Sequence, residues 1–163
     1  MRNGSLIIGL LALQACRQPD RADADSNFAR LQQRGATVMG VDQYTSKHIF
    51  QDLPSGGRIV LDRDDASDTA SIRAIRSHMR DIQRAFQRGD FTAPGLVHAR
   101  DVPGTSVLAE KRTAIRYAAV DRPRGAELRI LTADPAAVAA VHQFLAFQRA
   151  DHRAAGHEGH AGH

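Results

Sequence analysis

The chain has 163 residues, of which 42% are hydrophobic and 25% are charged, a balance typical of a globular protein. This length suffices for one domain of ordinary size and is too short for two. The formal net charge is +4, but the arginines are interleaved with acidic residues and form no basic run with stacking aromatics, so we do not expect nucleic acid as a partner.

The first 15 residues have the features of a bacterial signal peptide. Arg2 supplies a positive charge, and residues 6–13 form an apolar stretch that is too short to cross a bilayer as a helix, which takes about 20 residues. The stretch ends in a segment that resembles the lipobox of bacterial lipoproteins, Leu13-Gln14-Ala15-Cys16. The alternative interpretation is a buried N-terminal helix with an incidental cysteine.

Cys16 is the only cysteine in the chain, which excludes an intramolecular disulfide. By its resemblance to lipoproteins, the mature protein would carry several acyl chains on Cys16, enough for stable attachment to a membrane. We therefore expect a lipid-anchored protein of the bacterial cell envelope that faces the periplasm. Arg17, in the position where an aspartate would direct sorting to the inner membrane, favours the outer membrane.

Beyond the cysteine, composition divides the chain into three parts. Residues 16–36 are polar and are expected to form a flexible lipidated tether, with a short helix at residues 28–33. One folded domain is predicted over residues 37–153. Residues 154–163 are expected to be a disordered, histidine-rich tail.

The first half of the domain predicts a hairpin followed by a helix. Residues 48–53 and 58–62 are β-rich runs on either side of a turn that contains proline and two glycines. After a polar loop, apolar residues recur with helical spacing on one face, namely Ile72, Ile75, Met79, Ile82 and Phe86. Residues 90–105 contain several prolines and glycines and are predicted to be irregular.

The second half repeats this order. Residues 114–121 and 127–132 predict a second hairpin, and Asp134 followed by Pro135 is typical of a helix start. The helix is expected to run to about residue 152, with its core side chains at Val138, Val141 and Leu145. We therefore predict an α+β domain of two ββα units, in which a four-stranded antiparallel sheet carries both helices on one face.

The chain has eight histidines, of which seven are candidate metal ligands, and three of these lie in the tail. These are His157, His160 and His163, with glycine in the spacers, so their imidazoles are expected to be able to converge on one ion. Imidazole suits Cu, Zn and Ni. The alternative is an unstructured solubilising tail without a metal.

Four histidines of the domain are further candidate ligands: His48, His98, His142 and His152. His142 and His152 are ten residues apart on one predicted helix, about 15 Å along its axis, and therefore cannot share one ion. A folded site requires two or three of the four to converge. His78 lies beside the apolar stripe of the first helix and is expected to be partly buried and hydrogen-bonded.

The domain contains these short motifs: Gly40-Val41-Asp42-Gln43-x-x-x-x-His48-x-Phe50, Gly89-Asp90-Phe91-x-x-Pro94-x-x-x-His98, Pro103-Gly104 and His142-x-Phe144-Leu145-x-Phe147-Gln148-x-x-x-His152. They resemble the motifs of a family of small exported bacterial proteins, over about residues 38–152. The resemblance implies no particular activity. It does place the four candidate histidines of the domain inside the family-like motifs.

No nucleophile elbow, nucleotide-binding glycine loop or His-Glu-x-x-His motif is present, and we do not expect an enzyme. The leading hypothesis is an envelope-anchored lipoprotein that binds or buffers a transition metal through histidines. The first alternative is a binding or assembly module that recognises another envelope protein without a metal. The second is an enzyme of unknown class, for which a deep pocket with a pKa-shifted histidine would be the sign.

Overall fold

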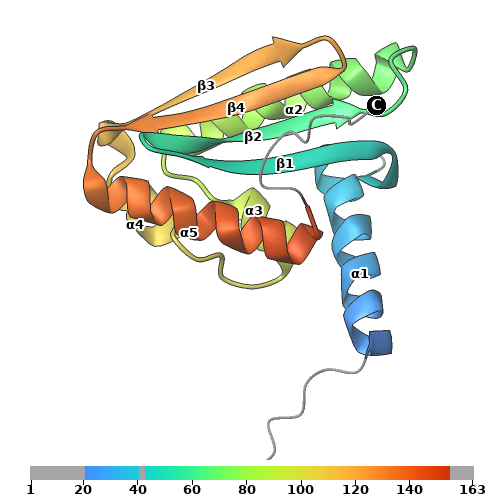
Figure 1. Ribbon diagram of the computed structural model, residues 1–163, viewed down its shortest axis with the longest axis horizontal. Coiled ribbons are helices and arrows are strands. Elements are labelled where there is room, and N and C mark those ends of the chain that lie inside the picture. The colour runs from blue at the N-terminus through green and yellow to red at the C-terminus, as the bar shows by residue number, and fades with distance from the viewer. Residues whose placement is uncertain (1–20, 41–42, 155–163) are drawn as a thin grey trace, which may run out of the picture.

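The computed structural model describes residues 21–40 and 43–154 (Figure 1). A four-stranded antiparallel sheet carries two long helices on one face, which confirms the predicted α+β fold. The strands are β1 (Ser46–Leu53), β2 (Gly56–Arg63), β3 (Ile115–Arg122) and β4 (Gly125–Thr132). The helices are α1 (Arg21–Met39), α2 (Thr69–Gln87), α3 (Thr92–His98), α4 (Thr105–Glu110) and α5 (Pro135–His152), with short 3-10 turns at Gln43–Thr45 and Arg112–Ala114.

The sheet is built from the two predicted hairpins. Its strand order is β1-β2-β4-β3, so the second strand of each hairpin pairs with the other at the centre. Register places Leu61 opposite Ala126 and Ile59 opposite Leu128, all on the face that the helices cover. The hairpins approach closely at Gly125, where any side chain would collide with the Leu61 carbonyl oxygen. The register of this central pair therefore depends on glycine.

Both long helices begin at an aspartate cap, and the cap of the second helix, Asp134, was predicted. The Asp68 carboxylate accepts a hydrogen bond from the Ser71 amide at 3.1 Å, and the Asp134 carboxylate accepts from the Ala136 and Ala137 amides. These bonds satisfy amide groups of the first turn that have no partner within the helix. In the part of the chain that the structure describes, no helix combines the length and apolar character needed to cross a membrane.

The core lies between the sheet and the apolar stripes of α2 and α5. The predicted core residues that are fully buried are Ile72, Ile75, Met79, Phe86, Val141 and Leu145. Ile82 and Val138 were predicted to belong to the same core but are only partly buried. Ile82 lines a cavity instead of being enclosed on all sides.

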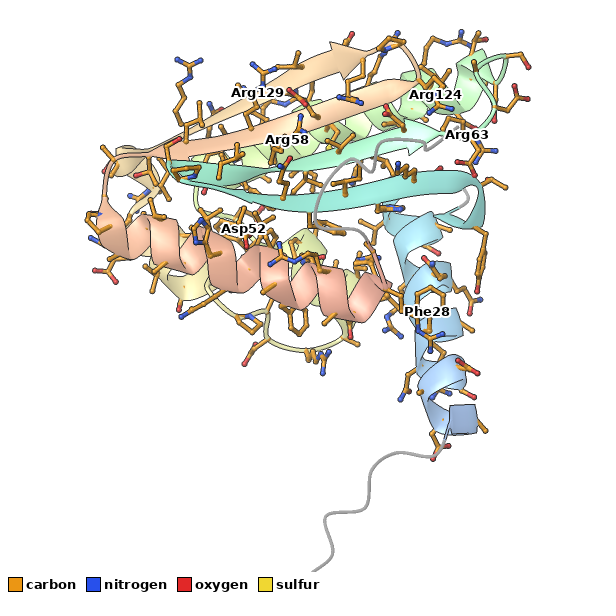
Figure 2. All side chains as sticks on the ribbon, in the orientation of Figure 1. Phe28, Asp52, Arg58, Arg63, Arg124 and Arg129 are labelled. Atoms are coloured by element: carbon orange, nitrogen blue, oxygen red, sulfur yellow. The ribbon has the colours of Figure 1, made fainter. Side chains whose placement is uncertain are left out.

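Arginine side chains gather on the opposite face of the sheet (Figure 2). Glu127 of β4 is only 3% exposed there, and its carboxylate contacts Arg129 at 2.5 Å and Arg58 at 3.3 Å. Arg122 contacts the neighbouring Asp62 at 2.9 Å. A buried carboxylate is stable only when it is paired. A substantial part of the positive charge noted in the sequence therefore belongs to ion pairs on this face.

Residues 21–36, expected to belong to a flexible tether, form most of helix α1. The helix is much longer than the predicted segment 28–33, and its C-terminal half packs on the domain. Leu31 is buried, and the Arg34 side chain donates a hydrogen bond to the Val97 carbonyl at 2.7 Å. The tether was predicted from the local polarity of these residues. Local polarity does not show that a segment will pack against a helix elsewhere in the chain.

Residues 90–105 were predicted to be irregular, but they contain helix α3. Pro94 lies in the first turn of this helix, where a missing amide donor breaks no intrahelical bond. The Asp90 side chain accepts from the Thr92 amide at 3.0 Å and supports the start of the helix. Pro94 thus lies in the first turn of a helix, whereas the prediction had treated proline here as a sign of irregular structure.

Candidate functional site

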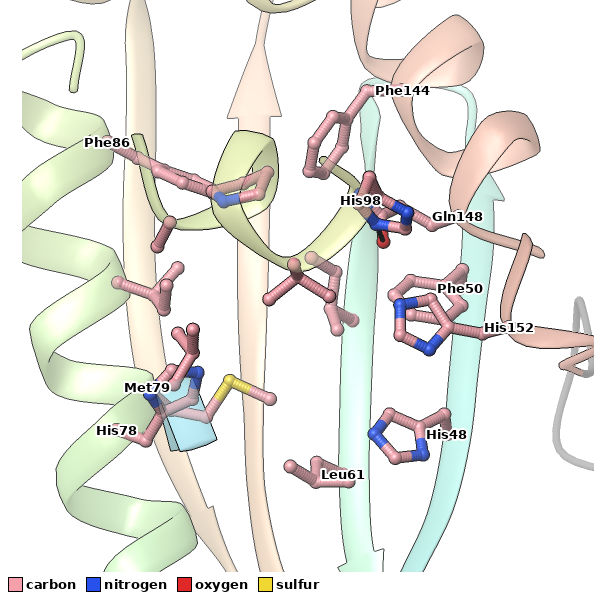
Figure 3. Close-up of a pocket in the computed structure, with 16 residues that line it drawn as sticks. His48, Phe50, Leu61, His78, Met79, Phe86, His98, Phe144, Gln148 and His152 are labelled. Atoms are coloured by element: carbon pink, nitrogen blue, oxygen red, sulfur yellow. Dashed lines mark hydrogen bonds between the residues drawn. The ribbon is translucent and has the colours of Figure 1, made fainter. Parts of the chain in front are cut away.

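A cavity of about 90 Å³ lies between α2 and α5 on the inner face of the sheet, with α3 along one side (Figure 3). Most of its lining is aliphatic or aromatic, and Met79 contributes a thioether. The polar side chains in the lining are His48, His78, His98, Gln148 and His152. An apolar cavity with a few convergent polar groups is the usual form of a small ligand site.

Strand and helix periodicity explain why these side chains meet. Alternation along β1 places His48 and Phe50 on the inner face of the sheet. Phe144, Gln148 and His152 are spaced by four residues on α5 and therefore share one side of that helix. The last residue of α3 is His98, which brings its ring to the same cavity.

His48, His98 and His152 form a contiguous group, the histidine cluster. The ring centroids of His48 and His152 lie 5.5 Å apart, and the two ring planes are nearly parallel at 15°. The ring of His98 lies 5.1 Å from that of His152 and is perpendicular to it. Phe50 contacts both His48 and His152 and gives the cluster an apolar floor.

His98 is held rigidly by its neighbours. Its side chain is 1% exposed, and Nδ1 donates to Asp151 Oδ2 at 2.5 Å. The other Asp151 oxygen accepts from Arg100 at 2.6 Å. A carboxylate accepts only, so it fixes a proton on Nδ1, and Nε2 is hydrogen-bonded to Gln148 Oε1 at 2.9 Å.

His48 and His152 each have one ring nitrogen that is buried without a partner. Within the described residues, His48 Nε2 and His152 Nδ1 have no hydrogen bond. Burial lowers the pKa of His48 to about 4 and that of His152 to about 3, because an imidazolium ion loses its hydration in an apolar cavity. A hydrogen bond to the Ser46 backbone acts in the opposite sense on the pKa of His48. Both rings are therefore uncharged at neutral pH and able to donate a lone pair.

The fourth candidate histidine of the domain lies outside this cavity. His142 Nε2 is 3.0 Å from the carbonyl oxygens of both Leu53 and Gly56 and donates to them, which ties α5 to the turn of the first hairpin. His78 was expected to be partly buried and hydrogen-bonded; its partial burial is confirmed, and it lines the cavity from α2. Burial lowers its pKa as well.

Sequence reasoning did not identify His78 and Met79 as site residues. Met79 has the spacing of a core residue and is buried like one, and His78 is its neighbour on the edge of the stripe. Helical spacing distinguishes the buried side of α2 from the exposed side. It carries no signal of which buried residues border a cavity, because the cavity depends on the position of α5.

Cys16 and the tail residues His157, His160 and His163 lie outside the described residues. Within residues 21–40 and 43–154, no three His, Cys, Asp or Glu side chains stand in an arrangement that could hold a metal ion. Comparison with protein families, curated proteins and solved structures finds no match for this chain. The geometry of the cavity is therefore the main guide to its function.

Proposed function

We propose that the protein is an envelope-anchored lipoprotein that binds a transition metal through histidines, with His48 and His152 as ligands inside the domain. The observation that carries the proposal is the pair of buried, uncharged imidazole nitrogens without partners at one cavity. Leaving a buried polar atom unpaired costs about 1–3 kcal/mol. A bound ion would give both nitrogens the partner that they lack.

The spacing of the rings supports this proposal. Two imidazoles that share a tetrahedral ion through bonds of about 2.0–2.1 Å have ring centroids roughly 5 Å apart. The ring centroids of His48 and His152 are 5.5 Å apart. The two rings stack nearly parallel at 15°, so their side chains must rotate for both nitrogens to face one ion.

The cavity with its pKa-shifted histidines is also the sign named for an enzyme, but the direction and size of the shifts argue against that alternative. A general acid or base works best with a pKa near the operating pH, and a pKa of about 3 or 4 makes His48 and His152 poor proton carriers at pH 7. A protein-docking module would favour a contiguous apolar surface. Among the described residues, the large hydrophobic side chains with high exposure are Tyr44 and Leu96, and isolated exposed residues of this kind are ordinary.

The metal proposal predicts two separable sets of ligands. Replacing His157, His160 and His163 by glutamine in the full chain is expected to remove the tail site and leave one site in the domain. In that background, His48→Gln with His152→Gln is expected to weaken binding by at least about tenfold, because neutral imidazole is the ligand. The measurement is titration calorimetry at pH 7.5 with Cu(I), Cu(II), Zn(II) and Ni(II) in turn.

His142→Gln is the matched control, because His142 lies on the same helix as His152 but its nitrogen serves the hairpin turn. The control is expected to bind like the parent. If the tail variant binds none of the four ions, the cavity histidines are structural and recognition of an envelope protein becomes the better hypothesis. If the full chain also binds none, the metal hypothesis is wrong.

The lipid anchor is tested separately. Cys16→Ser is expected to prevent lipidation and to move the protein from the membrane fraction to the soluble fraction, because the acyl chains are the proposed means of attachment. Detergent phase partitioning of both forms measures the shift. A Cys16→Ser protein that still enters the detergent phase would show that the segment ending at Cys16 is not a lipobox.

A further inference from the structure

We infer that the cavity binds a small uncharged organic molecule of the alcohol class, whose hydroxyl group donates a hydrogen bond to His48 Nε2. The ring of His48 extends from β1 into the cavity, toward Leu61 (Figure 3). This inference goes beyond the proposed metal function and uses the same nitrogen. A lone pair has one partner at a time, so the cavity holds either an ion or the organic molecule.

The hydrogen bonds of His48 make its Nε2 atom an acceptor. The contact of the ring with the Ser46 backbone raises the pKa of His48, as a carbonyl oxygen does when it accepts from a ring N–H group. Within the described residues His48 Nε2 is buried without a hydrogen bond, so Nδ1 is the nitrogen that donates to Ser46. A neutral imidazole carries one N–H group, which leaves a lone pair on Nε2. An organic ligand can satisfy this lone pair only with a hydrogen-bond donor.

The rest of the lining determines the charge and the polarity of the ligand. Among the described residues, no aspartate, glutamate, lysine or arginine lines the cavity. A charged ligand would therefore lose its hydration without gaining an opposite charge, which is strongly unfavourable. Ile59, Ile82, Phe86 and Val97 offer apolar contacts to a hydrocarbon group. A neutral molecule with one hydroxyl group and an apolar body matches both features of the lining.

The volume of the cavity, about 90 Å³, limits the size of the molecule. An apolar protein cavity of about 150 Å³ holds benzene, so the ligand enclosed here is smaller, with about three to five carbon atoms beside the hydroxyl group. Water alone fits the site less well, because a buried water needs about two to four polar partners. Two polar side chains of the lining, His98 and Gln148, already bond to each other.

The first experiment compares two isomers as probes, n-butanol and methyl n-propyl ether, by NMR titration of the metal-free full chain. The isomers contain the same atoms, but only the alcohol can donate a hydrogen bond. The parent is expected to bind n-butanol at least about fivefold more tightly than the ether, because the ether leaves His48 Nε2 unpaired. His48→Phe keeps an aromatic ring without the acceptor and is expected to bind both probes equally. His142→Gln is the control and should keep the preference of the parent, since His142 lies outside the cavity.

The second experiment is NMR of the imidazole nitrogens in the metal-free parent, which does not depend on how well a variant folds. His48 Nε2 is expected to give the signal of an unprotonated nitrogen. This signal should move when n-butanol is added and stay in place with the ether. A proton on Nε2, equal affinity of the parent for the two isomers, or no binding of either isomer would overturn the inference.

A third measurement separates this inference from the metal proposal. In the chain with the three tail histidines replaced by glutamine, saturating n-butanol is expected to weaken metal binding, because both occupants need His48 Nε2. Binding of a metal without binding of the alcohol would overturn the inference and leave the metal site standing. Binding of the alcohol by a chain that binds no metal would overturn the metal site and support the inference.

Discussion

Replacing Ile75 by alanine is expected to lower the free energy of unfolding by about 2–5 kcal/mol, while the same change at Ile82 should cost about half as much. Ile75 is 0% exposed and lies in the core between α2 and the sheet. Truncation there loses buried apolar contacts and leaves a void that close neighbours cannot fill. Ile82 is already partly exposed and borders the cavity, so its truncation enlarges a space that exists.

Denaturant unfolding of both variants and the parent measures this difference. The pair is well matched, because the chemical change is the same and both residues belong to the apolar stripe of one helix. A native domain is stable by only about 5–15 kcal/mol, so the loss at Ile75 would be a large fraction of the total. Equal losses at the two positions would mean that α2 is rotated relative to the arrangement described above.

Acidification from pH 6.5 to pH 4 is expected to destabilise the metal-free protein. An unfolded histidine has a pKa near 6.5, whereas burial lowers the pKa of His48 to about 4 and that of His152 to about 3. Between these values the unfolded chain binds more protons than the folded protein does, so stability falls as the pH falls. Each pKa unit corresponds to about 1.4 kcal/mol, and partial exposure of both residues reduces the combined effect to about 2–3 kcal/mol.

Other titratable groups also affect the pH dependence of stability. His78, whose pKa is also lowered by burial, faces His48 and adds to the same trend, whereas Asp151 raises the pKa of His152 and opposes it. The lowered pKa values of Asp68 and Asp134 act in the same direction near pH 4, because these carboxyl groups, with their ordinary pKa of 3.8, begin to bind protons there in the unfolded chain first. The trend between pH 6.5 and pH 5 therefore belongs mainly to the buried histidines.

Thermal melts of metal-free protein at pH 6.5, 5 and 4 measure this trend. Replacing both His48 and His152 by glutamine is expected to flatten it, because glutamine does not titrate. His142→Gln is the control and should keep the slope of the parent. A parent protein with the same melting temperature at pH 6.5 and pH 4 would show that His48 and His152 are not buried in their neutral form.

The elements of this fold could be predicted from the sequence because their signals are local. The β-rich runs on either side of a glycine turn indicated the first hairpin, and Asp134 followed by Pro135 indicated the start of α5. The repeated order of strand, strand and helix led to the four-stranded sheet with both helices on one face. Such signals depend on neighbours within a few residues, which remain the same wherever the element packs.

The histidine cluster was decided only by the tertiary structure. His48, His98 and His152 are 50 and 54 positions apart, and their meeting depends on the register of β1, the rotation of α5 and the docking of α3. His142 was an equally good candidate ligand in the sequence, yet its side chain bonds to the hairpin turn and lies outside the cavity. Helical spacing fixes the angle between His142 and His152. It is the packing of α5 against β1 and β2 that determines which of them reaches the cavity.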